Sequence, residues 1–565
     1  MRLPTDALKV AMVAVLAVTT GAAWAGKQDK KPEPDKPAAT FTARSELVLV
    51  PVIVRDKSGA HIGNLKKEDF TVLEERTEQK IAVFEEVNTT VTRLQRAKLS
   101  PGEFSNIVTG PQKPTRVTII ALDGINTSIF DQIYARQAII KYLSKAVENE
   151  ETVALIVLTR GGIRVIHDFT TDPSVLKAAL AKVQGDSSPV AENTVQADQE
   201  QALEQEEMEL QGFADATDFM REAANFQRKL GILATMEALQ QVADAFAGVP
   251  GRKSLIWASA GFPFSIDPSK PLEGKGFPRE SISDVMPVYE RTWEVLNNAN
   301  IALYPVDVRG LVTTGPSAAV RVPVNPRNPA AAVMRTSMVH MDTLDTFKRF
   351  ADMTGGKAYY NTNDLAGAFQ QAAADSSAYY MLGFYLDSKD TKPGWRKLEV
   401  KVHQSGAHVR AREGFFVTPA TQDPNRSAKS DMRMALASPL QFTALPIDGR
   451  WTETAPSPER PGRKRISFQL ALPAGLNLGD PSDTNHVVLE FAAVARTATG
   501  EDVDQFGKIL DGHLKPETMQ RLDQAGMHYS GALDLPPGDY SVRFVVRDNL
   551  SGRMGSLIAP LKVAP

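Results

Sequence analysis

The sequence predicts a multidomain α/β plus all-β protein, in which a doubly wound, mostly parallel six-stranded sheet is flanked by β-sandwich modules. Three observations indicate this fold class. The 565 residues exceed what one hydrophobic core usually serves. Between residues 114 and 377, continuous apolar runs alternate with helical patterns, as is typical of parallel strands joined by crossover helices. Before and after this region, short apolar runs separated by turn residues indicate antiparallel β modules.

Residues 1–25 have the pattern of a Sec signal peptide. Arg2 and Lys9 precede the apolar stretch 10–20, and Ala23-Trp24-Ala25 is a small-x-small cleavage site. Cleavage near Ala25/Gly26 would place the mature chain in the periplasm or outside the cell, without a transmembrane helix because no later apolar run is long enough to cross a membrane. An uncleaved anchor is the alternative.

Composition narrows the class of protein further. The chain has no Cys, which excludes disulfides and a lipidated cysteine and favours a bacterial secreted protein over an animal extracellular one. Its formal net charge of -3 does not indicate a nucleic-acid partner, which would require a basic face. Residues 26–43 are rich in Pro and Lys and are expected to form a disordered tether.

Two β regions enclose the central part of the chain. Residues 44–88 contain three strand-like runs, too few for an independent domain. We therefore expect them to pair with a β-meander at residues 378–417. Residues 430–565 show short alternating strands and predict an immunoglobulin-like β-sandwich.

The central region 114–377 is expected to form the parallel sheet. Its first strand is Val117–Leu122, followed by a helix Asp131–Val147 with Ile133, Ile140, Leu143 and Val147 on one face, which we expect to face the core. The short link Gly161-Gly162 permits only an antiparallel hairpin at the sheet edge. Lys357–Tyr360 would supply the sixth strand.

An acidic insertion, residues 184–220, interrupts this alternation. It holds ten Asp and Glu residues and no Lys or Arg. Its most acidic part, Gln199–Glu209, is either a solvated helix face or a docking element for Ca²⁺ or a partner.

Polar side chains follow the first central strand. Asp123, Asn126, Thr127 and Ser128 come directly after it, at the carboxyl edge where open α/β sheets place ligands. Their oxygens are of the type that hard cations prefer. The alternative is that these side chains cap the next helix and satisfy its free N–H groups.

Two further strands of the predicted sheet end in polar residues at the same edge. Ser259 follows one, and Asp307 and Arg309 follow the other. One interpretation is a charged rim that binds a partner. The other is an ion pair or a loop cap.

Sequence motifs for catalysis are incomplete. A phosphatase D-x-D would need an acid where Ile125 stands, and a G-x-S-x-G elbow around Ser259 lacks its first Gly. The eight His residues include no H-E-x-x-H motif. The chain is therefore expected to have no catalytic residues.

The order of central segments resembles a von Willebrand factor type A domain. The resemblance rests on the strand ending in Asp123 and on RGGIRVIHDFT, GRKSLIWASAGFP, IALYPVDVRG and FADMTGGKAYY. The flanking LVLVPVIVRDKSGAHIGNLKKEDFTVLEE and YYMLGFYLDSKDTKPGWRKLEVKVHQSGAHVRAREGFF resemble a secreted subgroup of A-domain-related proteins abundant in Acidobacteria. The resemblance covers roughly residues 44–417.

The resemblance implies protein binding through a metal-ion-dependent adhesion site. In the family, D-x-S-x-S, a loop Thr and a later Asp hold the divalent ion. Here Asp123 and Thr127 are kept, Ile125 replaces the first Ser, and Ser259 stands where the later Asp belongs. Asn126 and Ser128 offer replacement oxygens, so a degenerate site that binds Mg²⁺ weakly is expected, with no other cofactor.

The expected function is therefore a secreted or periplasmic, non-enzymatic binding protein of the adhesion type. It would engage a protein partner at the carboxyl edge of the A-domain sheet. The alternatives are a cell-envelope hydrolase with β accessory modules and a purely structural envelope scaffold.

Overall fold

The computed structural model describes most of the chain from residue 45 onward. The described residues are 45–89, 95–96, 99–109, 116–146, 151–170, 172–181, 214–262, 279–311, 343–387, 394–417, 424–478 and 483–564. The predicted signal peptide, the tether and the acidic run Gln199–Glu209 lie outside these ranges.

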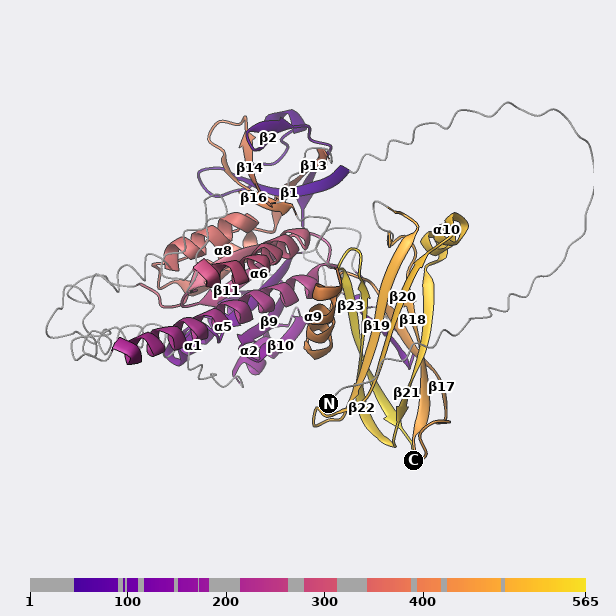
Figure 1. Ribbon diagram of the computed structural model, residues 1–565. Helices are drawn as coiled ribbons and strands as arrows, with labels where there is room; N and C mark the ends of the chain where they lie inside the picture. The colour runs from indigo at the N-terminus through magenta and orange to yellow at the C-terminus, as the bar shows by residue number, and fades with distance from the viewer. Residues whose placement is uncertain are drawn as a thin grey trace, which may run out of the picture. The chain divides into compact units, whose positions relative to one another are not determined.

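A five-stranded sheet forms the centre of the structure (Figure 1). Its strand order is β10-β9-β8-β11-β12; β9, β8, β11 and β12 are parallel, and β10 is antiparallel to β9. The strands are β8 (Val117–Asp123), β9 (Thr152–Thr159), β10 (Gly162–Thr170), β11 (Lys253–Ser259) and β12 (Ile301–Asp307). All residues of β8, β11 and β12 are buried, which explains their continuous apolar runs.

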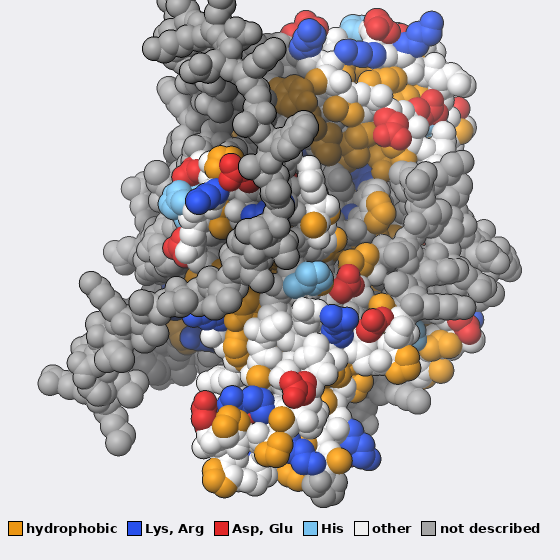
Figure 2. Space-filling view, turned by 90° about the vertical axis from the view of Figure 1, so that its right-hand side faces the viewer, with side chains coloured by type: hydrophobic (Ala, Val, Ile, Leu, Met, Phe, Trp, Pro, Cys, Tyr) orange, Lys and Arg blue, Asp and Glu red, His pale blue; other side chains and the backbone are white. Residues whose placement is uncertain are grey.

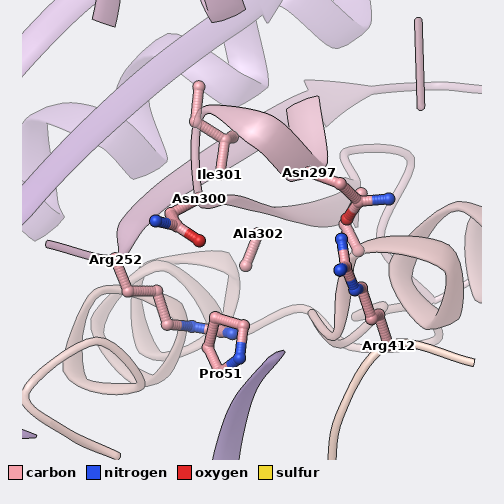
Figure 3. A pocket seen from close by; sticks show the side chains of 8 residues that line it. Pro51, Arg252, Asn297, Asn300, Ile301, Ala302 and Arg412 are labelled. Carbon is pink, nitrogen blue, oxygen red and sulfur yellow. The ribbon is translucent and has the colours of Figure 1, made fainter. Parts of the chain in front are cut away.

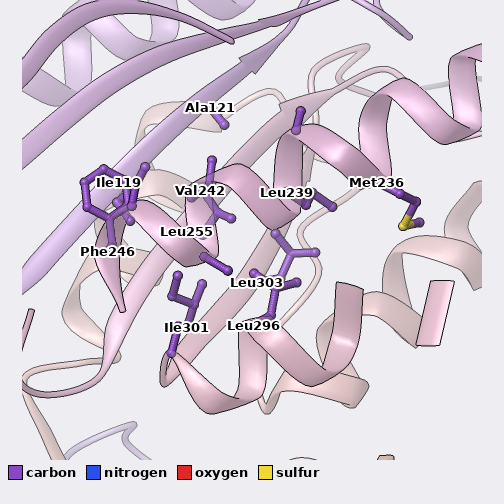
Figure 4. Packing of buried hydrophobic residues seen from close by; sticks show 14 of the residues in the cluster. Ile119, Ala121, Met236, Leu239, Val242, Phe246, Leu255, Leu296, Ile301 and Leu303 are labelled. Atoms are coloured by element: carbon purple, nitrogen blue, oxygen red, sulfur yellow. The ribbon is translucent and has the colours of Figure 1, made fainter. Parts of the chain in front are cut away.

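Helices cover both faces of this sheet because successive strand residues point to opposite sides. On one face, Ile119, Leu255 and Leu303 pack against α5 (Ala214–Phe246), α6 (Arg279–Asn298) and a helix over residues 343–354 (Figure 4). On the other face, Ile120, Ile256 and further strand residues pack against α1 (Ile129–Ala146), α2 (Pro173–Ala181) and α8 (Leu365–Ala374). No helix in the described part of the chain is long and apolar enough to cross a membrane.

The predicted fold class was wrong. The described chain is mostly β, most of its sheets are antiparallel, and no six-stranded doubly wound parallel sheet is present in it. The expected sixth strand, Lys357–Tyr360, forms only one isolated bridge, between Tyr359 and Val306. Asn361 then adopts a positive φ of 53°, which turns the chain away before a ladder can extend.

Strands from both sides of the central region form a β module around one core. Its two sheets have the orders β15-β1-β13-β4 and β16-β14-β2-β3, and buried residues such as Val50, Phe70 and Leu382 fill the space between them. The strands are β1 (Ser45–Arg55), β2 (Phe70–Glu74), β3 (Thr77–Gln79), β4 (Val83–Asn88), β13 (Ala378–Asp387), β14 (Gly394–Val402), β15 (His408–Arg410) and β16 (Gly414–Val417), and a short 3-10 helix spans Lys67–Asp69.

A second pair of four-stranded sheets forms the C-terminal sandwich, with the orders β21-β18-β17-β6 and β20-β19-β22-β23. Its elements are β6 (Glu103–Ser105), α9 (Pro424–Ala437), β17 (Asp448–Pro456), β18 (Lys464–Leu472), β19 (His486–Arg496), β20 (Asp502–His513), α10 (Pro516–Ala525), β21 (Met527–Leu535), β22 (Gly538–Asp548) and β23 (Met554–Val563). The short strands β5 (Gln95–Arg96) and β7 (Val108–Thr109) pair with each other.

One strand of this sandwich, β6, comes from the polar stretch that precedes the central sheet. It pairs with β17, and the buried side chain of Asn106 follows it. Asn106 Nδ2 donates to the carbonyls of Phe442 and Leu445 at 2.7 and 2.9 Å, and its Oδ1 accepts from Ile447 N at 2.7 Å. A segment far away in sequence is thus held by backbone groups of the sandwich.

A buried ion-pair cluster joins α6, α9 and β22. Asp431 Oδ2 accepts from Arg291 Nη2 at 2.9 Å and from Arg547 Nη2 at 2.8 Å. The Arg547 side chain is 3% exposed and that of Asp431 is 8% exposed. The two arginines thus share one carboxylate at the junction.

Replacement of Asp431 by Ala is expected to lower the free energy of unfolding by about 3 kcal/mol, since two arginines lose a buried counter-charge. Urea unfolding followed by circular dichroism measures this loss. The matched control is Asp539→Ala, whose carboxylate is exposed and 3.8 Å from Lys562. Equal unfolding midpoints for the two variants would contradict the role of Asp431.

Asp244 on α5 makes the stability of the same junction depend on pH. Burial raises the pKa of Asp244 from 3.8 to about 7, with a further rise from Asp431, while Arg291 and Arg547 oppose it. At pH values between 3.8 and about 7, the Asp244 carboxyl group holds its proton in the folded protein but has lost it in the unfolded chain. This carboxyl group therefore makes the free energy of unfolding fall as pH rises through this window.

We expect Asp244→Asn to have a flatter pH dependence of unfolding free energy than the wild type over that window. Urea unfolding at a series of pH values measures it, with Asp539→Asn as the surface control. A wild-type slope that persists in Asp244→Asn would show that the junction does not sense this proton.

Candidate functional site

Three polar residues lie at the carboxyl edge of the central sheet. Asp123 ends β8, Ser259 ends β11 and Asp307 ends β12. Ser259 and Asp307 are register partners, and Asp123 follows the last register pair of β8 with β11. The side chains of all three are fully buried. The sheet therefore brings the predicted site residues together, but beneath the surface.

The carboxylate of Asp123 accepts five hydrogen bonds. Its Oδ1 accepts from the backbone N–H groups of Ile125 and Asn126 at 2.8 and 2.9 Å. Its Oδ2 accepts from Ser259 Oγ at 2.7 Å, from Asn126 Nδ2 at 2.9 Å and from Trp257 Nε1 at 3.1 Å. This one side chain consequently connects the turn after β8 to two residues of β11.

Two opposing effects act on the ionisation of Asp123. Burial disfavours the charged form and raises the pKa of Asp123 above its ordinary value, while the hydrogen bonds from Asn126, Ser259 and Ile125 act to lower it. Burial is the larger effect. Nearby donors are therefore needed for a carboxylate to persist here.

Asn126 extends the network to helix α5. Its Nδ2 also donates to Thr235 Oγ1 at 2.9 Å, and Thr235 in turn donates to the carbonyl of Gly231 on the same helix. The Oδ1 of Asn126 is buried and has no hydrogen-bond partner among the described residues. Among the side chains of Asp123–Ser128, it is the only buried polar atom without a hydrogen-bond partner in the described part of the chain.

Thr127 and Ser128 have structural partners. Thr127 Oγ1 accepts from the backbone N–H of Ala260 at 3.1 Å. Ser128 Oγ accepts from the N–H of Asp131 at 3.2 Å and donates to its carboxylate at 2.7 Å. Ser128 therefore caps the first turn of α1, which is the alternative to metal binding that the sequence left open.

The residues around Asp123 do not fit Mg²⁺. An ionised carboxylate offers about four lone-pair sites, and five donors already point at this one. The Thr127 hydroxyl accepts from the backbone of Ala260, and the Ser128 hydroxyl is bonded to Asp131, whereas Mg²⁺ prefers several oxygen ligands. No group of three or more His, Asp or Glu side chains suited to a metal occurs in the described ranges.

Asp307 and Arg309 satisfy each other within one loop. Asp307 Oδ1 accepts from Arg309 Nε at 2.9 Å, and Oδ2 accepts from Arg309 Nη2 at 2.8 Å. The Arg309 backbone N–H also donates to Oδ1 at 3.1 Å. This bidentate pair shapes the loop after β12, as the ion-pair interpretation of the sequence proposed.

Ser259 has no described histidine partner. Its Oγ bonds Asp123 and the backbone of Gly261, and the side chain is fully buried. An acid and a histidine converging on this hydroxyl would have favoured a hydrolase.

An exposed apolar surface lies at the same edge of the sheet. Phe130, Ile133 and Tyr134 on the first turns of α1 are 80%, 42% and 38% exposed, and Leu311 after β12 is 57% exposed. We call these four residues the α1 patch. Asn363 links Tyr134 to Leu311, because Tyr134 Oη donates to the Asn363 carbonyl and Asn363 Oδ1 accepts from Leu311 N.

The sequence pattern missed this surface because it placed Ile133 on the core face of the helix. The buried face of α1 instead carries Ala135, Ile139, Tyr142 and Leu143. Because an α-helix has 3.6 residues per turn, Phe130, Ile133 and Tyr134 lie on the opposite side of α1 from this buried face. A large aromatic residue two positions after the Ser128 cap was the available signal.

Comparisons with known proteins give no family. No family model matches the chain, and no curated protein matches it. Similar solved structures include two of the pilus adhesin SpaC from Lactobacillus rhamnosus GG, one in an open conformation, at 8% and 7% identity and TM-scores of 0.25 and 0.27. These matches cover 84% and 90% of this chain but only 57% and 58% of the adhesin chains.

A β-glucuronidase from Bacteroides uniformis is also similar, at 10% identity and a TM-score of 0.14 over 33% of this chain and 19% of that one. TM-scores this low carry no argument about fold or function, and neither does the partial coverage. The resemblance to von Willebrand A domains stays a prediction.

We expect titration of Mg²⁺, Mn²⁺ or Ca²⁺ into the protein to give no saturable binding heat that depends on Asp123, because its lone pairs are already used. Isothermal calorimetry of the wild type and of Asp123→Asn measures this. A saturable heat in the wild type that Asp123→Asn abolishes, while the variant keeps its circular dichroism spectrum, would restore the metal site.

Proposed function

We propose that this protein is a secreted or periplasmic, non-enzymatic binding protein whose central domain is of the von Willebrand A type. It binds a protein partner at the carboxyl edge of the sheet, without a metal ion. The α1 patch is the contact surface. Ser259, Asp307 and Arg309 lie at the same edge of the sheet.

The observation that carries the proposal is the exposure of Phe130. A phenylalanine that is 80% exposed beside three other partly exposed apolar residues is unfavourable in water unless a partner covers it. Aromatic side chains are also the residues that most often dominate protein interfaces. The patch lies where open α/β sheets present their binding loops.

The hydrogen-bond network of Asp123 supports the proposal by making this surface rigid. It fixes the turn between β8 and α1, and Ser128 fixes the first turn of the helix that carries Phe130. A contact surface that is ordered before binding loses little conformational entropy on association.

The net charge of the chain supports a protein partner over a polyanion, because the formal value is -3. Figure 2 shows one face of the molecule, on which acidic and basic side chains are interspersed. A protein surface with a matching apolar area is the chemistry that fits the α1 patch. Ser259 is fully buried and its hydroxyl donates to Asp123, so it is not placed to act as the exposed nucleophile that the hydrolase alternative would need.

Replacement of Phe130 by Ser is expected to weaken partner binding at least about tenfold, since a buried aromatic contact at an interface is worth more than 1.4 kcal/mol. The protein should keep its unfolding midpoint because the side chain is exposed. Immobilised wild type and Phe130→Ser are used to capture proteins from an envelope extract of the source bacterium. The captured protein is then purified and titrated calorimetrically.

Ile509→Ser is the matched control, since this side chain is 53% exposed on β20, in the C-terminal sandwich. We expect it to bind like the wild type. Equal binding by Phe130→Ser, or capture of no protein that depends on Phe130, would contradict the proposal and favour the scaffold alternative.

A further inference from the structure

A small cavity lies at the other end of the central sheet, where the β module meets it (Figure 3). Its volume is about 10 Å³. Pro51 of β1 lines it from the β module, and Asn300 and Ile301 line it from the start of β12. Arg252 and Arg412 approach it from opposite sides in Figure 3.

Arg412 is a buried cation with an unused donor. The residue is 7% exposed, and its Nη2 donates to the carbonyl of Leu49 at 3.0 Å. Its Nε is buried with no hydrogen-bond partner among the described residues. Burial lowers the pKa of Arg412 to about 10, so the guanidinium is still charged at neutral pH.

Arg252 repeats this arrangement from the strand side. It is 1% exposed, and its Nη2 donates to the Gly355 carbonyl at 2.6 Å and to Tyr304 Oη at 3.2 Å. Its Nε is also buried and unpartnered within the described residues. Two guanidinium groups thus face one cavity, each bonded to neutral groups.

The region has more positive than negative charge. The residues that line the cavity include no Asp or Glu. Asp375 is a nearby acid, since it raises the pKa of Tyr304 while Arg252 lowers it. It already forms ion pairs with Arg55 and Arg410. Buried charges normally have a partner of opposite sign, because an uncompensated one costs several kcal/mol.

The geometry points to a binding site for a small monovalent anion, with chloride as the expected ligand, between Arg252 and Arg412. The volume of about 10 Å³ is small, which favours a monatomic ion over phosphate, sulfate and carboxylates. The anion accepts from the free guanidinium N–H groups. It thereby links Arg412 of the β module to Arg252 at the start of β11.

Chloride NMR tests the site directly. Protein is added to sodium chloride, and the excess ³⁵Cl line width is measured during titration with sodium bromide at constant ionic strength. We expect a saturable excess that bromide removes. Arg412→Met should lose this excess, while the control Arg460→Met, whose side chain is half exposed beside Asp504, should keep it.

Bromide anomalous diffraction from wild-type crystals provides the second measurement, which holds even where Arg412→Met does not fold. An anomalous peak in the cavity supports the proposal. A wild type without excess line width, or crystals whose cavity holds only water in bromide, would overturn it.

Discussion

The buried carboxylate of Asp123 is the interaction on which the carboxyl edge of the central sheet depends. A charged group in an apolar interior is stable only when donors surround it. Here the donors come from the turn after β8 and from two positions of β11, and Asn126 carries the network on to α5. Satisfying one charge therefore orders the ends of two strands and the start of one helix.

The same requirement explains how the polar side chains that end β8, β11 and β12 are used. Trp257 and Ser259 direct their polar hydrogens at Asp123, and Asp307 is held by Arg309. Polar groups that would bind a cation or a substrate in an open site are used within the protein. What the edge offers to the outside is apolar surface, above all Phe130 and its neighbours on α1. The polar groups of this edge are therefore buried and bonded, while its exposed side chains are apolar, as the proposed binding of a protein partner requires.

Long-range connections join the described strands on both sides of the central region. β1 pairs with β13 across more than three hundred residues of sequence, and β6 joins the C-terminal sandwich through β17. Asn106 and Asp431 then satisfy polar groups at these junctions. Each such contact contributes little to the free energy of folding. Each is buried, however, and leaving one of its polar groups unpaired would cost more.

Apolar runs and turn residues were sufficient to locate the buried strands β8, β11 and β12, because a strand covered on both faces must be apolar throughout. Sequence also indicated that Asp123, Ser259 and Asp307 would share one sheet edge, since parallel strands end on the same side. The number of strands in the central sheet could not be predicted from these patterns. Whether residues 357–360 extend a ladder depends on the positive φ of Asn361 and on the neighbouring β12, not on local composition.

The chemistry at the edge was likewise decided by tertiary contacts. In sequence, Asp123 and Thr127 are compatible with a metal site or with a helix start, because oxygen atoms serve both purposes. Trp257 and Thr235 come from distant segments, and only their arrival at Asp123 and Asn126 shows that donors fill the positions a cation would need. The residues alone determined which oxygens meet at the edge of the sheet. Folding determined that these oxygens are used inside the protein, because burial leaves a carboxylate no stable alternative to hydrogen bonding.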